Sequence, residues 1–95
     1  FFVFDHEACI VASARRLVKL NSPRPGWVEQ DPFELIESVK EVIDEVHATV
    51  LRERNVKLSE KLVAIGLTNQ RETTIAWDAD TSIPHGPAIG NRPAL

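Results

Sequence analysis

The sequence predicts an α/β fold in which a mixed β-sheet carries a helix on one face, with the element order β-β-α-β-β. Two observations lead to this prediction. A helix-start signal at Asp31-Pro32 opens a long stretch whose apolar residues recur at three- and four-residue spacing. The continuous apolar run Leu62–Leu67 follows that stretch, and such a run is typical of a central parallel strand that is buried on both faces.

The composition fits an ordinary globular protein and excludes several other classes. Of the 95 residues, 43% are hydrophobic and 26% are charged, which excludes general disorder. The net charge is −3 and no run of basic residues is longer than Arg15-Arg16, so a nucleic-acid-binding protein is not expected. The apolar runs are shorter than the ~20 residues that span a bilayer, so no membrane span is expected. The single cysteine, Cys9, excludes an internal disulfide and predicts a reducing, cytoplasmic location.

The first elements are predicted to form a β-hairpin. Phe1–Phe4 is apolar and β-rich, Asp5-His6-Glu7 is typical of a turn, and Ala8–Leu20 supplies the second strand. Cys9 is expected to be a small core residue of this hairpin. Asn21–Gly26 holds two prolines and a glycine, which exclude regular structure. Because the chain begins with Phe1 inside a predicted strand, we expect it to be the interior of a longer protein.

The strongest local signal is the start of a helix. Asp31 suits the N-cap, Pro32 suits the first helical position, and Glu34 can close a capping box. The apolar spacing continues for many turns, so we expect a helix from about Pro32 to Arg54. The apolar stripe of this helix, which we expect to pack on the sheet, consists of Phe33, Ile36, Val39, Ile43, Val46 and Val50.

Two strands are predicted after the helix. Leu62–Leu67 is expected to be the interior strand of the sheet. Thr73–Trp77 is expected to be a further strand that ends at Asp78-Ala79-Asp80. The last dozen residues hold three prolines and two glycines and show no periodic pattern.

The six polar residues Asn69–Thr74 follow the predicted interior strand, at the strand end where ligands bind in open α/β sheets. Arg71 can donate hydrogen bonds in a fixed fork and Glu72 can accept them, so the pair could grip the vicinal hydroxyls of a polyol. The alternative is an ordinary polar loop with a surface ion pair, which the spacing alone favours. Trp27 has two interpretations as well, as a stacking platform for a ligand or as a plug at the base of the helix, and the second is favoured.

Two segments taken together resemble the glycerol kinases, which belong to the FGGY carbohydrate kinase family. They are Pro25–Pro32, with the sequence Pro-Gly-Trp-Val-Glu-Gln-Asp-Pro, and Ala64–Asp78, which contains the specific string Asn-Gln-Arg-Glu-Thr-Thr. The spacing between the two segments also fits, as does Phe2–Asp5 for the second strand of the family. The similarity covers about residues 1–89, and xylulose kinases differ from it at this strand end.

The resemblance implies a fold, a reaction and a substrate site. The fold is part of the first of two ribonuclease-H-like domains, as in the actin–hexokinase ATPase superfamily. The reaction is transfer of the ATP γ-phosphoryl group to glycerol, with Mg²⁺, giving sn-glycerol 3-phosphate. Arg71 and Glu72 correspond to the pair that binds glycerol. No catalytic, cofactor or metal residue is assigned within this chain, and ATP and Mg²⁺ are expected only in the complete enzyme. The remainder of the kinase chain, in a homo-oligomer, is the implied partner.

The sequence also departs from the family pattern. Glycerol kinases carry an Asp-Gln-Gly-Thr-type phosphate loop before the strand that opens this chain, and after Ala88-Ile89 they continue with a tryptophan that packs on glycerol. Here the sequence continues as Gly90–Leu95, and residues 83–95 are interpreted as a divergent tail. We therefore expect residues 1–95 to be part of the FGGY N-terminal domain, without its first strand and phosphate loop, and inactive alone. The alternative is a non-catalytic remnant or interaction module of FGGY ancestry, which the flanking reading frame would distinguish.

Overall fold

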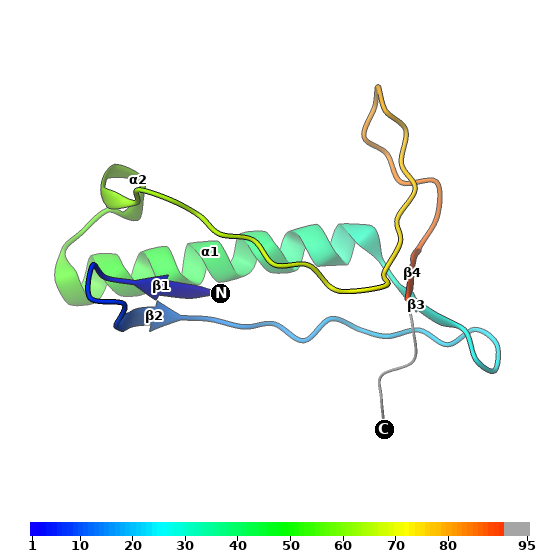
Figure 1. Ribbon diagram of the computed structural model, residues 1–95, viewed down its shortest axis with the longest axis horizontal. Coiled ribbons are helices and arrows are strands. Elements are labelled where there is room, and N and C mark those ends of the chain that lie inside the picture. Colours follow the sequence, from blue (N-terminus) through cyan, green and yellow to red (C-terminus); the bar gives the residue numbers. More distant parts are fainter. Residues whose placement is uncertain (91–95) are drawn as a thin grey trace. The chain divides into compact units, whose positions relative to one another are not determined.

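A computed structural model describes residues 1–90 and shows an α/β chain with two small antiparallel sheets, each of two strands. The described chain forms two compact units. One unit contains residues 1–17 and 37–67, and the other contains residues 18–36 and the chain from Thr68 onward. In chain order the elements are β1 (Phe2–Phe4), β2 (Ile10–Ser13), β3 (Val28–Gln30), α1 (Pro32–Arg54), α2 (Leu58–Lys61) and β4 (Ala88–Gly90) (Figure 1). The predicted order β-β-α-β-β and the single mixed sheet are therefore not found in residues 1–90.

The predicted N-terminal hairpin is present, but its second strand is Ile10–Ser13 and is much shorter than the predicted Ala8–Leu20. β1 pairs with β2 in antiparallel register, with Val3 opposite Ala12. The connecting turn is stabilised by Asp5, whose Oδ1 accepts hydrogen bonds from the backbone N–H groups of Glu7 at 2.9 Å and Cys9 at 3.0 Å. These bonds favour the charged carboxylate and lower the pKa of Asp5. Cys9 lies exposed in this turn, so the expectation that it is a core residue is wrong.

The core of the first unit lies between the hairpin and α1. It is formed by small and β-branched side chains: Val3, Ala12, Ala14, Val42, Val46 and Val50. The three valines of α1 are spaced four residues apart, so they form one line along the helix. A two-stranded hairpin covers little more than such a line. This is the physical reason why Val46 and Val50 of the predicted stripe are buried whereas Val39 and Ile43, in the same unit, are exposed. Phe33 and Ile36, the stripe residues that belong to the second unit, are exposed as well.

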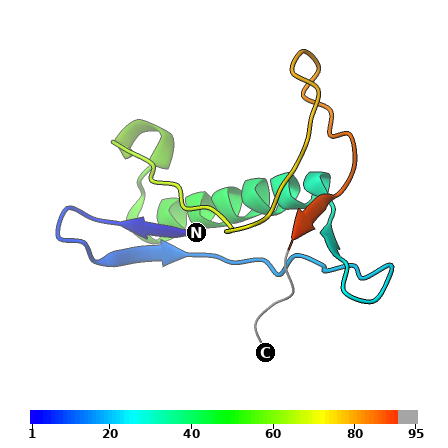
Figure 2. The ribbon, with the colours of Figure 1, turned by 45° about the vertical axis from the view of Figure 1, so that its right-hand side comes forward.

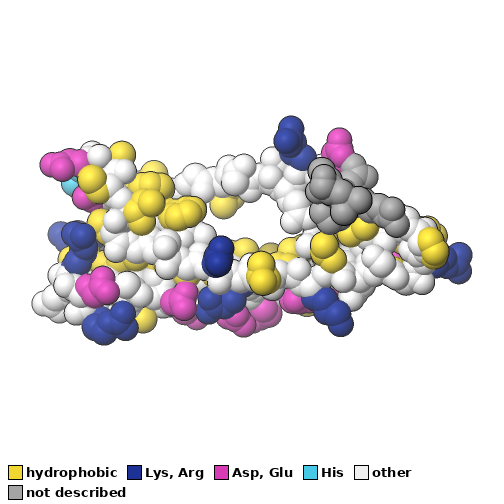
Figure 3. Space-filling view, turned by 90° about the horizontal axis from the view of Figure 1, so that it is seen from below, with side chains coloured by type: hydrophobic (Ala, Val, Ile, Leu, Met, Phe, Trp, Pro, Cys, Tyr) yellow, Lys and Arg dark blue, Asp and Glu magenta, His cyan; other side chains and the backbone are white. Residues whose placement is uncertain are grey.

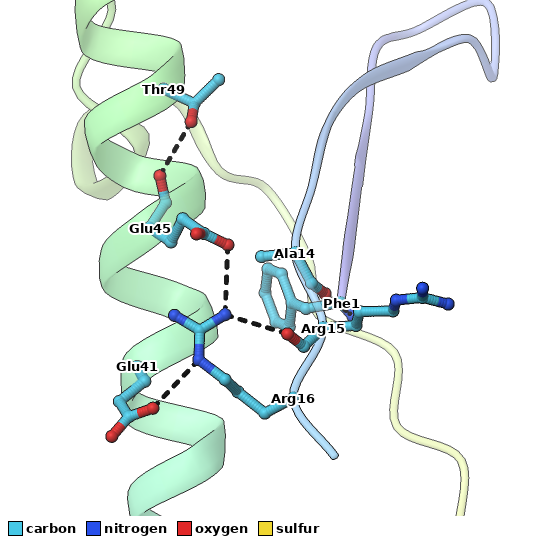
Figure 4. Close-up of polar contacts among 7 residues, drawn as sticks. All are labelled: Phe1, Ala14, Arg15, Arg16, Glu41, Glu45 and Thr49. Atoms are coloured by element: carbon cyan, nitrogen blue, oxygen red, sulfur yellow. Dashed lines mark hydrogen bonds and ion pairs between the residues drawn. The ribbon is translucent and has the colours of Figure 1, made fainter.

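Arg16 links the segment after β2 to the same helix (Figure 4). Its Nε donates to Glu41 Oε2 at 3.0 Å, and its Nη1 donates to Glu45 Oε2 at 3.4 Å and to the carbonyl oxygen of Arg15 at 2.9 Å. The hydrogen bond to Glu41, together with the charge of Glu45, raises the pKa of Arg16. All three side chains are well exposed, so this cluster orients the segment more than it stabilises the fold.

The prediction of an interior strand at Leu62–Leu67 is wrong. The short helix α2 precedes this segment, and within residues 1–90 the segment has no strand structure and is exposed throughout. Val63 is 88% exposed and Leu67 is 94% exposed. Hydrophobic side chains are visible on the surface among charged ones in Figure 3. An interior strand needs a hydrogen-bonded neighbour on each side, and the paired strands of this structure come from other segments.

The start of α1 follows the sequence prediction closely, and the helix has the predicted bounds Pro32–Arg54. Asp31 Oδ1 accepts a hydrogen bond from the backbone N–H of Phe33 at 2.9 Å, as an N-cap residue does. Glu34 acts differently from the predicted capping box. Its Oε1 accepts a hydrogen bond from the backbone N–H of Lys19 at 3.1 Å, which fixes the preceding loop to the first turn of the helix.

The second unit is organised around β3 and β4, which pair antiparallel with Glu29 opposite Ile89 (Figure 2). Each strand also forms one isolated bridge on its other side: Glu29 of β3 pairs with Asn21, and Ile89 of β4 pairs with Thr74. The backbone at Asn21, β3, β4 and the backbone at Thr74 therefore lie side by side in this order. Neither β3 nor β4 was predicted. The predicted strand Thr73–Trp77 is present only as isolated bridges at Thr74 and Trp77. Residues 91–95 of the predicted tail lie outside the described residues.

Candidate functional site

The sequence-predicted site residues Arg71 and Glu72 lie next to each other in an exposed turn of the second unit. Glu72 has a φ of +62°, in the left-handed region that side chains with a Cβ rarely adopt. This conformation costs about 1–2 kcal/mol, so neighbouring contacts must hold it in place. Two such contacts, one on each side of the turn, anchor it to the sheet formed by β3 and β4.

The first anchor precedes the turn and is made by side chains. Gln70 Nε2 donates to Gln30 Oε1 at 2.7 Å and to Thr73 Oγ1 at 2.8 Å. Gln30 lies on β3 and is only 7% exposed. One amide group of Gln70 therefore ties the start of the turn to a buried strand residue and to the residue that ends the turn.

The second anchor follows the turn and is made by the backbone. The N–H of Thr74 donates to the carbonyl of Ile89 at 2.8 Å, and the N–H of Ile89 donates back at 2.9 Å. The approach of β4 is close beside this bridge, because a Cβ on Gly90 would lie 3.4 Å from Thr73 Oγ1. A side chain at this position would therefore touch the threonine hydroxyl.

The two anchors differ from what the sequence suggested. Arg71 and Glu72 were expected to follow a buried strand. Leu62–Leu67 is exposed and forms no strand, so this segment cannot fix the position of the turn. The hydrogen bond from Gln70 to Gln30 of β3 fixes the position of the turn instead. Gln30 was missed as a site residue because it was considered part of the link to the helix. The signal that could have found it is its period-two spacing from buried Val28, which places both side chains on one face of a strand.

The turn carries a guanidinium and a carboxylate on consecutive residues, Arg71 and Glu72, and both residues are exposed. The guanidinium only donates hydrogen bonds and the ionised carboxylate only accepts them. Together they are complementary to neighbouring hydroxyl groups, each of which donates and accepts. The two side chains could therefore form complementary hydrogen bonds with a polyol.

A hollow of about 250 Å³ lies along the same pair of strands. It is lined by Gly26, Trp27, Val28, Glu29, Ile89 and Gly90. The Trp27 side chain is half exposed, and the Arg24 guanidinium lies 5.1 Å from the centre of its ring, within the range of a cation–π contact. The interpretation of Trp27 as a plug at the base of the helix is therefore wrong.

The described part of the chain shows neither a metal-binding cluster nor a membrane-spanning helix. Residues 1–90 contain no group of three or more histidine, cysteine, aspartate or glutamate side chains placed to hold a metal ion. In the same range, no helix combines the length and the apolar character that a bilayer crossing requires.

Comparison with known proteins defines the class. Residues 1–91 match the model of the N-terminal domain of the FGGY family of carbohydrate kinases. The match covers almost the whole chain, so the chain belongs to the FGGY family.

The similar curated proteins carry a more specific name. The chain is 46% identical over 89 residues to a Dictyostelium discoideum protein named "Probable glycerol kinase" and 43% identical over 89 residues to the glycerol kinase of Haloferax volcanii. It is 45% identical over 84 residues to the glycerol kinase of Haloarcula marismortui. These alignments cover 94%, 94% and 88% of this chain, and 16% of each relative. The chain thus spans about one sixth of the length of the curated relatives that it matches.

Proposed function

We propose that this chain is a segment of a glycerol kinase, which transfers the γ-phosphoryl group of ATP to glycerol and releases sn-glycerol 3-phosphate. The observation that carries the proposal is the Asn69–Thr74 string, which forms an anchored turn with Arg71 and Glu72 as consecutive exposed residues. The names of the similar proteins support the choice of substrate.

The proposed role of Arg71 and Glu72 is to bind and orient glycerol. The Arg71 fork donates to hydroxyl oxygens of glycerol, and the Glu72 carboxylate accepts from hydroxyl hydrogens. A site built in this way rejects analogues that lack a hydroxyl, because its polar groups would be left unpaired. Orientation is the main contribution that a protein makes to phosphoryl transfer, since the step depends on positioning and charge neutralisation.

ATP and Mg²⁺ are assigned to the complete kinase. The described residues contain no group of three or more histidine, cysteine, aspartate or glutamate side chains that could hold a metal, and the ligands of Mg²⁺ are proposed to lie in other parts of the complete kinase. When bound, Mg²⁺ neutralises charge on the transferring phosphoryl group. The contribution of this chain is restricted to the polyol side of the reaction, and the chain alone is proposed to be inactive.

The domain to which this segment belongs in the complete kinase is part of the proposal as well. We infer that in the complete kinase this segment is part of a ribonuclease-H-like domain of the actin–hexokinase superfamily. The exposed apolar run Leu62–Leu67 supports this inference, because such a run is normally covered by other parts of a protein. A cytoplasmic location and a homo-oligomeric assembly of the complete kinase belong to the same proposal, and the single cysteine supports the first.

The test uses the complete reading frame that contains this segment. The purified product is assayed for ATP-dependent phosphorylation of glycerol, of propane-1,3-diol and of xylulose. The proposal predicts efficient turnover of glycerol and at least tenfold weaker use of the diol, which lacks the middle hydroxyl. A complete product that folds but phosphorylates none of the three would favour the non-catalytic remnant instead.

A further inference from the structure

Gln30 is the buried polar side chain among residues 1–90. Burying an amide without a hydrogen-bond partner is unfavourable, so a glutamine at such a position requires a partner to be held opposite it. That partner is Gln70, whose Nε2 lies 2.7 Å from Gln30 Oε1 although the two residues are 40 positions apart in the chain. The bond couples a residue of β3 to the residue immediately before Arg71.

The position of Gln30 is itself fixed by the backbone. β3 lies in the middle of the row of four segments, because Glu29 pairs with Asn21 on one side and with Ile89 on the other. The hydrogen bonds between Asn21 and Glu29 are both 2.8 Å long. The amide of Gln30 therefore projects from a strand that is held on both sides.

The Arg71–Glu72 turn needs such an anchor. Its backbone is strained at Glu72, so contacts around the turn must hold this conformation in place. Gln70 supplies two of these contacts by bonding at once to Gln30 and to Thr73 Oγ1 across the turn. Loss of the Gln30 acceptor leaves Gln70 bonded only to Thr73, so the turn loses its tie to β3 and keeps only the backbone bridge between Thr74 and Ile89.

We propose that Gln30 is a positioning residue for substrate binding, which acts through Gln70 to set the direction of Arg71 and Glu72. The proposal rests on the proposed function, because it assumes that these two side chains bind glycerol. Gln30 itself contacts no substrate. Its effect should therefore appear in the binding of glycerol and leave the binding of ATP unchanged.

The experiment compares variants of the complete kinase. Gln30→Met keeps the length of the side chain and removes the acceptor, and Gln30→Glu keeps an oxygen facing Gln70. Glu29→Met, at the neighbouring half-buried position of β3, is the matched control. We expect Gln30→Met to raise the KM for glycerol about fivefold, the effect of one lost hydrogen bond, with the KM for ATP unchanged. Gln30→Glu should restore most of the glycerol affinity, and Glu29→Met should leave both constants unchanged.

Arg71→Lys and Glu72→Gln, measured in parallel, separate the two proposals. If both impair glycerol use while Gln30→Met leaves the KM for glycerol unchanged, the positioning role is overturned and the proposed function stands. If Gln30→Met raises the KM for glycerol and for ATP alike, the residue is merely structural and the inference also fails. If neither Arg71→Lys nor Glu72→Gln affects glycerol use, the proposed glycerol site is itself wrong.

Discussion

Val46 provides the most direct test of the packing between the hairpin and α1. Its side chain is fully buried and lies in the cluster that includes Val3, Ala12 and Ala14. Val46→Ala removes two methylene-sized groups, which corresponds to about 1.6 kcal/mol of lost transfer free energy. The alanine neighbours are too short to fill the resulting cavity, which raises the expected destabilisation to about 2–3 kcal/mol.

Val39→Ala is the matched control, because Val39 lies on the same helix with a side chain that is 49% exposed. Both substitutions change helix propensity equally, so the difference between the two unfolding free energies reports packing alone. Urea denaturation followed by far-UV circular dichroism measures it. We expect the control to stay within about 0.5 kcal/mol of the parent chain. Equal destabilisation by the two variants would show that the hairpin does not pack on this line of the helix.

Two further predictions concern pH and activity. Asp78 Oδ1 accepts from the N–H groups of Thr81 and Asp80, which lowers the pKa of Asp78 below its ordinary value of 3.8. The stabilisation of this turn by the Asp78 carboxylate is therefore complete above about pH 4 and is lost as the pH falls through the lowered pKa. An acid titration followed by amide NMR should show the turn loosening only in that lower pH range. Asp78→Asn should remove that transition, whereas Asp80→Asn should keep it. The chain of residues 1–95 alone should show no glycerol-dependent ATP turnover, and measurable turnover by the purified chain would contradict its assignment as a segment that supplies only the polyol side of the site.

The elements that the sequence predicted well are those specified by neighbouring residues. The Asp31–Phe33 cap bond spans two residues, and it determines where α1 begins. The Asp5 turn is equally local and explains the success with the first hairpin. The periodicity predicted an amphipathic helix. It could not predict which apolar residues of the helix would be buried, because that depends on the width of the hairpin that packs on it.

The elements that could not be predicted depend on partners far away in the sequence. β3 and β4 have three residues each, and they pair with each other across almost sixty residues of sequence. The apolar run Leu62–Leu67 has the composition of an interior strand, but composition does not supply the neighbouring strands. The same holds for the candidate site. Arg71 and Glu72 were found by motif, whereas the bond from Gln30 to Gln70 follows from tertiary structure alone.

The central claim is that Arg71 and Glu72 bind glycerol, and steady-state kinetics of the complete kinase at saturating ATP test it most directly. Arg71→Lys keeps the charge and loses the planar fork, and Glu72→Gln keeps the shape and loses the charge. Loss of one charge-assisted hydrogen bond costs roughly 1.5–3 kcal/mol. Each variant is therefore predicted to lower kcat/KM for glycerol at least tenfold while the melting temperature stays nearly unchanged. Wild-type kcat/KM for glycerol in both variants would contradict the account.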